Sequence, residues 1–181
     1  MSNSIVTISG LPGSGTSTAC ALLRDKLGWS YVNAGQIFRD LAREAGLSLA
    51  DFGRRAEGDA SIDRVLDARM VETARAEQPI ILEGRVTGWM AARNQLPALK
   101  VWLDAAVEIR AARVGTRDGE VAAAARENMV LRQASEEQRY RQHHGIEIGD
   151  MSIYDLVIDT SVYPPAEVVR QIEMRLKGDK R

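Results

Sequence analysis

A glycine-rich segment near the N-terminus has the residue types and spacing that bind a phosphate group. The run GLPGSGTST occupies residues 10–18, between an apolar stretch at 5–8 and a helix-like stretch at 18–23. Small residues let backbone N–H groups curl around an anion, and the N-terminus of the following helix adds a positive dipole. The order of strand, loop and helix, with the spacing G-x-x-x-x-G-K-[ST], indicates a P-loop that binds the phosphates of a nucleotide.

One position of this loop departs from the P-loop pattern. Thr16 stands where the pattern has lysine, so cations from elsewhere must neutralise the γ-phosphate of a bound ATP. Ser17 follows it, where a hydroxyl can reach a nucleotide-bound Mg²⁺. The alternative is a glycine-rich turn of a dinucleotide-binding fold, but Thr18 occupies its third glycine position and no acidic residue ends the second strand near Val32 and Asn33. We therefore expect ATP to contact the loop through Gly10, Pro12, Gly13, Ser14, Gly15, Thr16, Ser17 and Thr18.

Two arginines follow predicted strands at the edge of the sheet where ligands bind. Arg39 comes shortly after the second strand, and Arg85 comes just after the buried run IILE at 80–83. Ligands of an open α/β sheet lie outside the carboxyl ends of its strands, so both side chains can reach one phosphate beside the P-loop. Glu83, at the tip of the same strand, can orient Mg²⁺ or its water ligands. On position alone, Arg39 is also compatible with a solvated helix position that makes an ion pair.

A second group of arginines lies late in the chain, between residues 126 and 141. Taken alone, its alternation with glutamate and glutamine is typical of a solvated helix with i,i+4 pairs. Its position in a long connection also suits a lid, since phosphoryl transfer needs cations that close over the transferred group and exclude water. Arg132 and Arg139 differ by seven residues, two helical turns, and therefore share one side of the helix. The adjacent His143 and His144 lack companion ligands at metal-binding spacing and are expected at the C-terminal end of this helix.

These residues need a scaffold that brings them together. Short apolar strands alternate with helices, which favours a parallel sheet with right-handed crossovers. Two connections, residues 34–78 and 116–150, are too long for simple crossovers and are expected to be helical insertions over the sheet. We therefore predict one α/β domain over residues 1–181, a P-loop NTPase fold in which helices flank a five-stranded parallel sheet and the second insertion is a lid. The expected strands are 5–9, 31–33, 80–83, 99–103 and 155–159, and the expected helices outside the first insertion are 16–27, 106–116, 120–143 and 164–176.

Composition limits the partners that the chain can have. It has 181 residues, 45% of them apolar and 27% charged, and a net charge of −1, so no basic field favours nucleic acid or a membrane surface. Its single cysteine, Cys20, cannot form an internal disulfide and suits a reducing cytoplasm. The N-terminus lacks the features of a signal peptide, and no apolar run is long enough to span a membrane. We expect a cytoplasmic monomer whose partners are small-molecule nucleotides.

Together these features resemble the archaeal-type, short cytidylate kinases, which are nucleoside monophosphate kinases of the P-loop superfamily. This family tends to carry threonine at the lysine position of the P-loop, as Thr16 does here. The matching stretches span nearly the whole chain in order: ISGLPGSGTST at 8–18, AGQIFRDLA at 34–42, 56–63, LEGR at 82–85, Gly88 and Trp89, 135–140, GIEI at 145–148 and SIYDLVIDTS at 152–161.

The resemblance implies a core, a monophosphate-binding insertion and a lid, and the MgATP-dependent phosphorylation of CMP or dCMP to CDP or dCDP. By position in the family's motifs, Arg39 and Arg85, with Gly35, would hold the acceptor monophosphate. Arg132 and Arg139 would be the lid arginines and would act with Arg85 in catalysis. Catalysis would then consist of positioning and charge neutralisation by Mg²⁺ and arginines.

The residues themselves leave the identity of the acceptor open. Cytosine offers one donor and two acceptors, so its recognition needs an acid or amide plus a donor, and Asp63 is the substrate-binding candidate, with Asp59 and Arg64. A sister kinase on the same core would act on AMP, UMP or a small alcohol, for which Asp40 or Asp63 could serve as the base. A nucleotide-binding switch without turnover is the third possibility, against which the surplus of arginines and the missing guanine-reading motif N-K-x-D argue.

Overall fold

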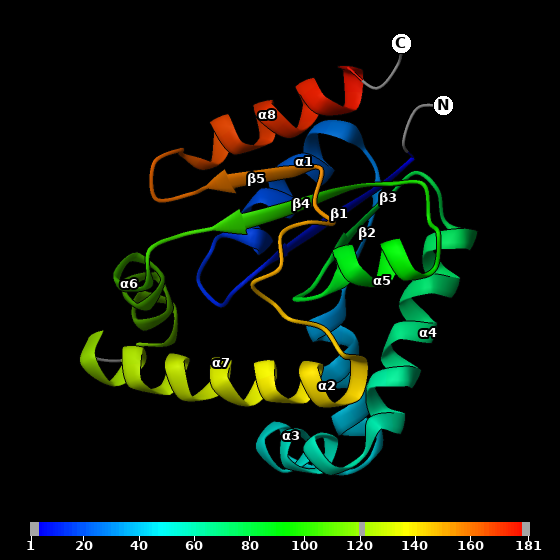
Figure 1. The fold of residues 1–181 in the computed structure, drawn as a ribbon. Coiled ribbons are helices and arrows are strands. Elements are labelled where there is room, and N and C mark those ends of the chain that lie inside the picture. The colour runs from blue at the N-terminus through cyan, green and yellow to red at the C-terminus, as the bar shows by residue number, and fades with distance from the viewer. Residues whose placement is uncertain (1–3, 120–121, 179–181) are drawn as a thin grey trace.

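The computed structural model describes residues 4–119 and 122–178, and it confirms an α/β fold built on a five-stranded parallel sheet (Figure 1). The strands are β1 (Ile5–Gly10), β2 (Ser30–Asn33), β3 (Ile80–Glu83), β4 (Ala98–Asp104) and β5 (Leu156–Asp159). Their order in the sheet is β2-β3-β1-β4-β5, and each pairing is parallel. The carboxyl ends of all these strands therefore meet at one edge of the sheet.

Helices cover both faces of this sheet, which is why its central strands are apolar on both sides. The helices are α1 (Thr16–Leu27), α2 (Ala34–Glu44), α3 (Leu49–Gly58), α4 (Ala60–Ala76), α5 (Thr87–Arg93), α6 (Val107–Asp118), α7 (Ala122–His144) and α8 (Pro165–Gly178). α1 and α8 pack on one face around Leu23 and Ile172, and α4 and α5 pack on the other around Met70 and Met90. β1 alternates between these two cores, with Ile8 facing α1 and α8.

Three helices, α2, α3 and α4, fill the insertion predicted at 34–78. Gly46, in the left-handed region at a φ of 68°, follows α2. Ser48 and Asp59 cap α3 and α4, since each side chain accepts a hydrogen bond from a backbone N–H two or three residues later. The insertion has a small core of its own around Phe52, separate from the two cores of the sheet.

The long helix α7 lies across the carboxyl edge of the sheet (Figure 1). Near its start, Met129 packs against Ala111 and Val114 of α6. At its other end, His143 lies 3.4 Å from Asp63 of α4, so α7 connects the two sides of the sheet edge. The second insertion is therefore helical, as expected, and bridges the α6 side of the molecule to the first insertion.

The expected strands and helices are confirmed, with ends that differ by at most two residues. One element was not predicted: α5, a short helix in which no side chain of the described residues caps the N-terminus at Val86. Cys20 is fully buried and packs in the core between α1, α8 and the sheet. Among the described residues, no helix is long and apolar enough to cross a membrane. Residues 120 and 121 of the expected lid, and the expected frayed tail beyond 178, lie outside the described ranges.

Candidate active site

A cavity of about 1300 Å³ opens at the carboxyl edge of the sheet. Its wall combines the P-loop, the start of α2, the end of β3 and parts of α3, α6 and α7. Ligands of open α/β sheets bind at this edge, so the cavity lies where the fold predicts a site. The predicted site residues that line it are Pro12, Gly13, Gly15, Thr16, Ser17, Thr18, Gly35, Arg39, Glu83, Arg85 and Arg139.

The P-loop has the backbone shape that an anion site requires. Gly13 and Gly15 have φ angles of 82° and 87°, in the region that favours glycine. No side chain within the described ranges caps the N-terminus of α1, so its first-turn N–H groups remain for phosphate oxygens. Gly10 and Ser14 lie beneath the loop rather than on the cavity wall, and a Cβ at Gly10 would lie 2.3 Å from the Ser14 hydroxyl oxygen. A side chain at position 10 would therefore distort the loop.

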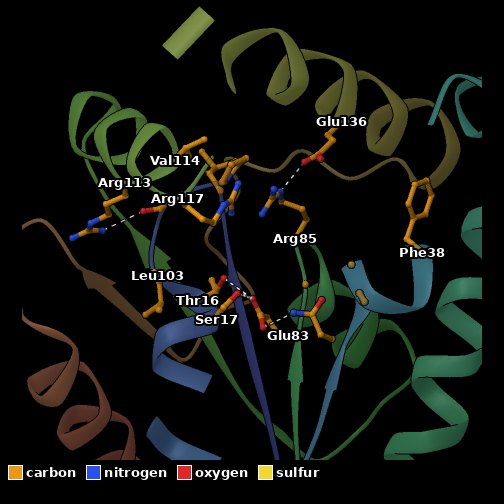
Figure 2. Close-up of a pocket in the computed structure, with 18 of the residues that line it drawn as sticks. Thr16, Ser17, Phe38, Glu83, Arg85, Leu103, Arg113, Val114, Arg117 and Glu136 are labelled. Carbon is orange, nitrogen blue, oxygen red and sulfur yellow. Dashed lines mark hydrogen bonds and ion pairs between the residues drawn. The ribbon is translucent and has the colours of Figure 1, made fainter. Parts of the chain in front are cut away.

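Thr16 and Ser17 both donate hydrogen bonds to Glu83 (Figure 2). The hydroxyl oxygens of Thr16 and Ser17 lie 2.8 Å and 2.6 Å from Glu83 Oε1. The side chain that replaces the usual lysine thus contacts the carboxylate at the end of β3. A hydroxyl and a carboxylate on one cavity wall are hard oxygen ligands of the kind that Mg²⁺ prefers, so these residues fit that ion.

The second oxygen of Glu83 is held from β2, by two residues that the sequence reasoning missed. Asn33 Nδ2 lies 2.6 Å from Glu83 Oε2, and the Tyr31 hydroxyl donates to the same oxygen. Burial, followed by the hydrogen bond to Glu83, raises the pKa of Tyr31 above its ordinary value, so its hydroxyl stays protonated as a donor. Burial and then the nearby Glu83 charge raise the pKa of the Cys20 thiol, which fits an unreactive core residue.

Arg85 links the P-loop to α7. Its Nη1 donates to the Gly10 carbonyl oxygen at 2.9 Å, and its Nε donates to Glu136 Oε2 of α7 at 2.7 Å (Figure 2). Both side chains of the ion pair are largely buried. The guanidinium is therefore fixed beside the P-loop, on the wall of the cavity, where the sequence predicted it.

Arg39, on α2, also lines the cavity. Its Nε and Nη2 atoms donate to the side-chain oxygen of Gln36, at 3.2 Å and 2.8 Å. Among the described residues this neutral oxygen is its hydrogen-bond partner, and no acid forms a salt bridge with it. Arg39 is exposed on its helix, as in the solvated position that was the alternative, but its partner is an amide rather than an acid. Gly35, one turn earlier, also lines the cavity, and a Cβ there would lie 3.0 Å from Asn33 Oδ1.

Arg139 comes from α7 and reaches the cavity between two aromatic rings. Its guanidinium carbon lies 5.4 Å from the ring centre of Phe38 and 5.2 Å from that of Tyr140. Its Nε lies 3.5 Å from Asp63 Oδ2, and the side chain is 11% exposed. Arg132 belongs to the same helix, but its side chain lies outside the described part of the structure. The structure thus places one of the two predicted lid arginines at the site.

Asp63 lies behind Arg139, within the contact between α4 and α7. It is 2% exposed and is not part of the cavity lining among the described residues. His143 Nδ1 and His144 Nε2 lie 3.4 Å and 3.7 Å from the Asp63 Oδ2 atom. Burial disfavours the charged form of Asp63, but His144 and Arg139 outweigh this and hold its pKa below the ordinary value. The two histidines, expected only at the end of the helix, therefore surround a buried carboxylate.

The arginines of α6 were not predicted from the sequence. Arg110 donates to the Pro12 carbonyl oxygen at 3.3 Å, and Arg113 donates to the Gly13 carbonyl oxygen at 3.2 Å. Arg113 and Arg117 line the cavity beside the P-loop (Figure 2). Positions 110, 113 and 117 are spaced by three and four residues, which places them on one side of a helix. This spacing was the signal that could have found them.

Comparison with known proteins identifies the family of this chain. The model of the cytidylate kinase-like family matches residues 5–162. The chain belongs to the cytidylate kinase-like family. The resemblance inferred from the sequence motifs is thereby confirmed, and cytidylate kinases from archaea are its curated relatives.

The alignments with these cytidylate kinases cover most of this chain. It is 44% identical to the cytidylate kinase of Methanococcus vannielii over 174 residues, which cover 96% of this chain and 99% of the relative. It is 44% identical to that of Halobacterium salinarum, covering 91% of this chain and 84% of the relative. It is 43% identical to that of Pyrococcus furiosus, covering 89% and 82%.

Solved structures share its fold at low sequence identity. A shikimate kinase from Acinetobacter baumannii has a TM-score of 0.63 and 16% identity, and covers 98% of this chain and 95% of its own. A gluconokinase from Sinorhizobium meliloti has a TM-score of 0.62 and 14% identity, and covers 99% and 98%. At these identities the likeness shows the P-loop kinase fold alone.

Proposed function

We propose that this member of the cytidylate kinase-like family phosphorylates CMP, with ATP as the phosphoryl donor. The observation that carries the proposal is one cavity that is lined both by a phosphate-binding loop and by Arg39 and Arg85. A donor and an acceptor phosphate bound there would lie side by side. Family membership supports CMP as the acceptor, and dCMP is the second acceptor that we expect.

In this proposal the protein accelerates the transfer by positioning and charge neutralisation. The P-loop amides hold the β- and γ-phosphates, while Arg39 and Arg85 bind the phosphate of CMP. Ser17, and Glu83 through water, would hold Mg²⁺, which supplies charge neutralisation at the phosphoryl oxygens. The attacking oxygen of the acceptor phosphate is already anionic, so the reaction needs no strong general base.

We further propose that the segment 116–150 acts as a lid and the segment 34–78 as the acceptor-binding insertion. Arg139 already lies at the cavity, and Arg132 is expected to act beside it. Closure of α7 over both nucleotides would exclude water and limit the hydrolysis of ATP. Asp63 would act on the acceptor indirectly, by holding Arg139. The protein is proposed to work as a monomer in the cytoplasm.

An alcohol kinase or a switch without turnover is not favoured. The two carboxylates considered as bases, Asp40 and Asp63, are not among the described residues that line the cavity. Asp40 forms an ion pair with Arg43 on α2 at 2.8 Å, away from the P-loop. The arginines around the cavity suit two phosphate groups better than one.

A coupled assay across acceptors tests the proposal. With MgATP, CMP and dCMP should be phosphorylated faster than UMP, AMP or GMP. If AMP or UMP is turned over about tenfold faster than CMP at saturating ATP, a transition-state difference of about 1.4 kcal/mol, the proposed acceptor is wrong.

Arg39→Ala provides a second arm of this test. Loss of a charge-assisted contact should cost about 2–4 kcal/mol in kcat/KM for CMP and leave the KM for ATP nearly unchanged. Arg43→Ala, an exposed position on the same helix, is the control. An equal loss for ATP and CMP would place Arg39 on the donor side instead.

A further inference from the structure

Asn33 lies at the point where three parts of the site meet. It ends β2 and is paired in register with Glu83 at the end of β3, so the two side chains lie next to each other on adjacent strands. Its Nδ2 atom lies 2.6 Å from Glu83 Oε2 and 3.0 Å from the Tyr31 hydroxyl. Its Oδ1 atom accepts a hydrogen bond from the backbone N–H of Gln36 at 3.1 Å and so caps α2.

The carboxylate of Glu83 is therefore held from two sides. The hydroxyls of Thr16 and Ser17 donate to Oε1, and the groups of Asn33 and Tyr31 donate to Oε2. Four donors fix both the position and the plane of a carboxylate that is 5% exposed. A Ser17 hydroxyl whose proton points to Glu83 turns its lone pairs elsewhere, which is the orientation that a cation ligand needs.

The oxygen of the Asn33 amide contacts α2, the helix that carries the proposed acceptor-binding residues. It caps the helix that carries Gly35 and Arg39 on the cavity wall. One planar amide thus connects the first turn of α2 to the carboxylate beneath the P-loop. A shift of the α2 N-terminus on acceptor binding would act on Glu83 through this group.

We propose that Asn33 is a positioning residue that couples the acceptor-binding helix α2 to Glu83, with Tyr31 as a second anchor of the carboxylate. This proposal rests on the proposed function, in which Glu83 holds Mg²⁺ through water and Arg39 binds the phosphate of the acceptor. Asn33 lines the cavity, but its hydrogen bonds go to Glu83, Tyr31 and the first turn of α2, so it would act through these groups. A residue that only capped α2 would affect stability and would not link the two ligands.

Asn33→Ser separates coupling from capping. Serine is as good an N-cap as asparagine, but its shorter side chain cannot both cap α2 and reach Glu83. Tyr31→Phe removes the other donor to Oε2 without touching α2. Ser48→Ala is the matched control, because Ser48 caps α3 in the same way and is not among the described residues that donate to Glu83. Thermal melting of each variant reports whether the fold is intact.

The measurement is the affinity for a non-hydrolysable ATP analogue by calorimetry, with Mg²⁺ or with EDTA, and with or without CMP. In the wild type, Mg²⁺ should tighten analogue binding, and CMP should tighten it further by about fivefold or more, a typical coupling between sites. In Asn33→Ser, most of the Mg²⁺ effect and the CMP effect should be lost, while affinity in EDTA stays within about twofold. Tyr31→Phe should weaken the Mg²⁺ effect and keep the CMP effect, and Ser48→Ala should keep both.

Unchanged Mg²⁺ and CMP effects in Asn33→Ser would overturn the proposal and leave Asn33 as a helix cap. Equal losses in Ser48→Ala would also overturn it, because capping alone would then explain the result. A wild-type protein that binds the analogue but not CMP would instead refute the proposed function. Failure of the coupling proposal is therefore seen in the variants, whereas failure of the proposed function is seen in the wild-type protein.

Discussion

Glu83 and Asp63 are both buried carboxylates, but their surroundings differ in kind. Glu83 accepts hydrogen bonds from neutral hydroxyl and amide groups, three of them at 2.6–2.8 Å. Asp63 has Arg139 and two histidines around one oxygen at 3.4–3.7 Å. Its other oxygen, Oδ1, has no hydrogen-bond partner within the described residues. One carboxylate is held by short directional bonds, and the other by cationic or titratable groups at longer distance.

The difference follows from the elements that each carboxylate joins. Glu83 lies between neighbouring strands and the P-loop, whose relative positions the sheet fixes. Asp63 joins α4 to α7, which belong to different insertions. Hydrogen bonds weaken steeply with distance and angle, whereas attraction between charges declines slowly with separation. If the proposed roles hold, Glu83 is a fixed carboxylate beside the P-loop and Asp63 is an adjustable contact of the proposed lid.

Replacing Glu83 by glutamine should have the largest effect, because it tests the fixed carboxylate. Glutamine keeps the size but removes the charge and turns an amide group toward donors. We expect kcat to fall about 10²–10³-fold, as when a preorganised electrostatic group is lost. Steady-state kinetics with MgATP and CMP measures this, with Glu72→Gln on the exposed side of α4 as control. A loss below about tenfold, or 1.4 kcal/mol, would make Glu83 a structural group of the strand ends.

Arg139→Ala should have the next largest effect and tests whether the Asp63 contact serves catalysis. The variant should lower kcat by about 10²-fold through lost transition-state charge stabilisation, and Arg132→Ala should do the same. The CMP dissociation constant should stay within a few-fold. Single-turnover kinetics with equilibrium binding separates the two quantities, and Arg141→Ala, an exposed residue paired with Glu147, is the control. Near wild-type kcat in both variants would show that α7 has no catalytic role and is a solvated charged helix.

Asp63→Asn tests the adjustable contact itself through stability. Because the pKa of Asp63 is lower in the folded protein, its contribution is present above the unfolded pKa, near 4, and is lost as pH falls through the folded pKa. The variant should lose roughly 1–3 kcal/mol of unfolding free energy at neutral pH, since buried partners lose their acceptor. It should also lose less stability than the wild type on acidification below about pH 4. Urea unfolding across this range measures both, with exposed Asp25→Asn as control, and parallel pH curves would contradict the assignment.

Thr16→Ala should have the smallest effect. It removes one of the neutral donors to Glu83, worth about 0.5–1.5 kcal/mol, so kcat should fall only a few-fold. Ser17→Ala should cost more, because that hydroxyl is also the proposed Mg²⁺ ligand. Thr16→Lys should not improve the enzyme, since arginines already supply the charge. A rise in kcat of about tenfold for Thr16→Lys would refute this.

Local patterns predicted most of the fold, because apolar strands, glycine breaks and caps are encoded within short stretches of sequence. The buried run at 80–83 was found in this way. The strand order was not predicted, since it depends on contacts between distant segments. α5 was missed because it is short and begins at Val86 without a capping side chain.

The site was predicted where a motif or a strand end marked it, and missed where only tertiary contact made it. Gly13 and Arg85 follow recognisable strands and lie on the cavity wall. Asn33 was mentioned only because no acidic residue ends the second strand. Its contact with Glu83 depends on the register of two strands that are far apart in the sequence. Asp63 was expected to contact the acceptor, but residues of α7 cover it. The sequence of α4 alone does not show that Arg139, from a distant helix, lies against this carboxylate.

The close approach of Gly13 to α6 gives the molecule a mechanical property. A Cβ at Gly13 would lie 2.5 Å from the Arg110 carbonyl oxygen, so the P-loop and the α6 backbone are already in contact. Arg110 and Arg113 tie the same turn of the helix to the Pro12 and Gly13 carbonyl oxygens. Loop and helix are therefore linked by backbone contact and by two arginine side chains, so we expect them to move together. A displacement of the loop on nucleotide binding would therefore act directly on a helix that lies a hundred residues away in the chain.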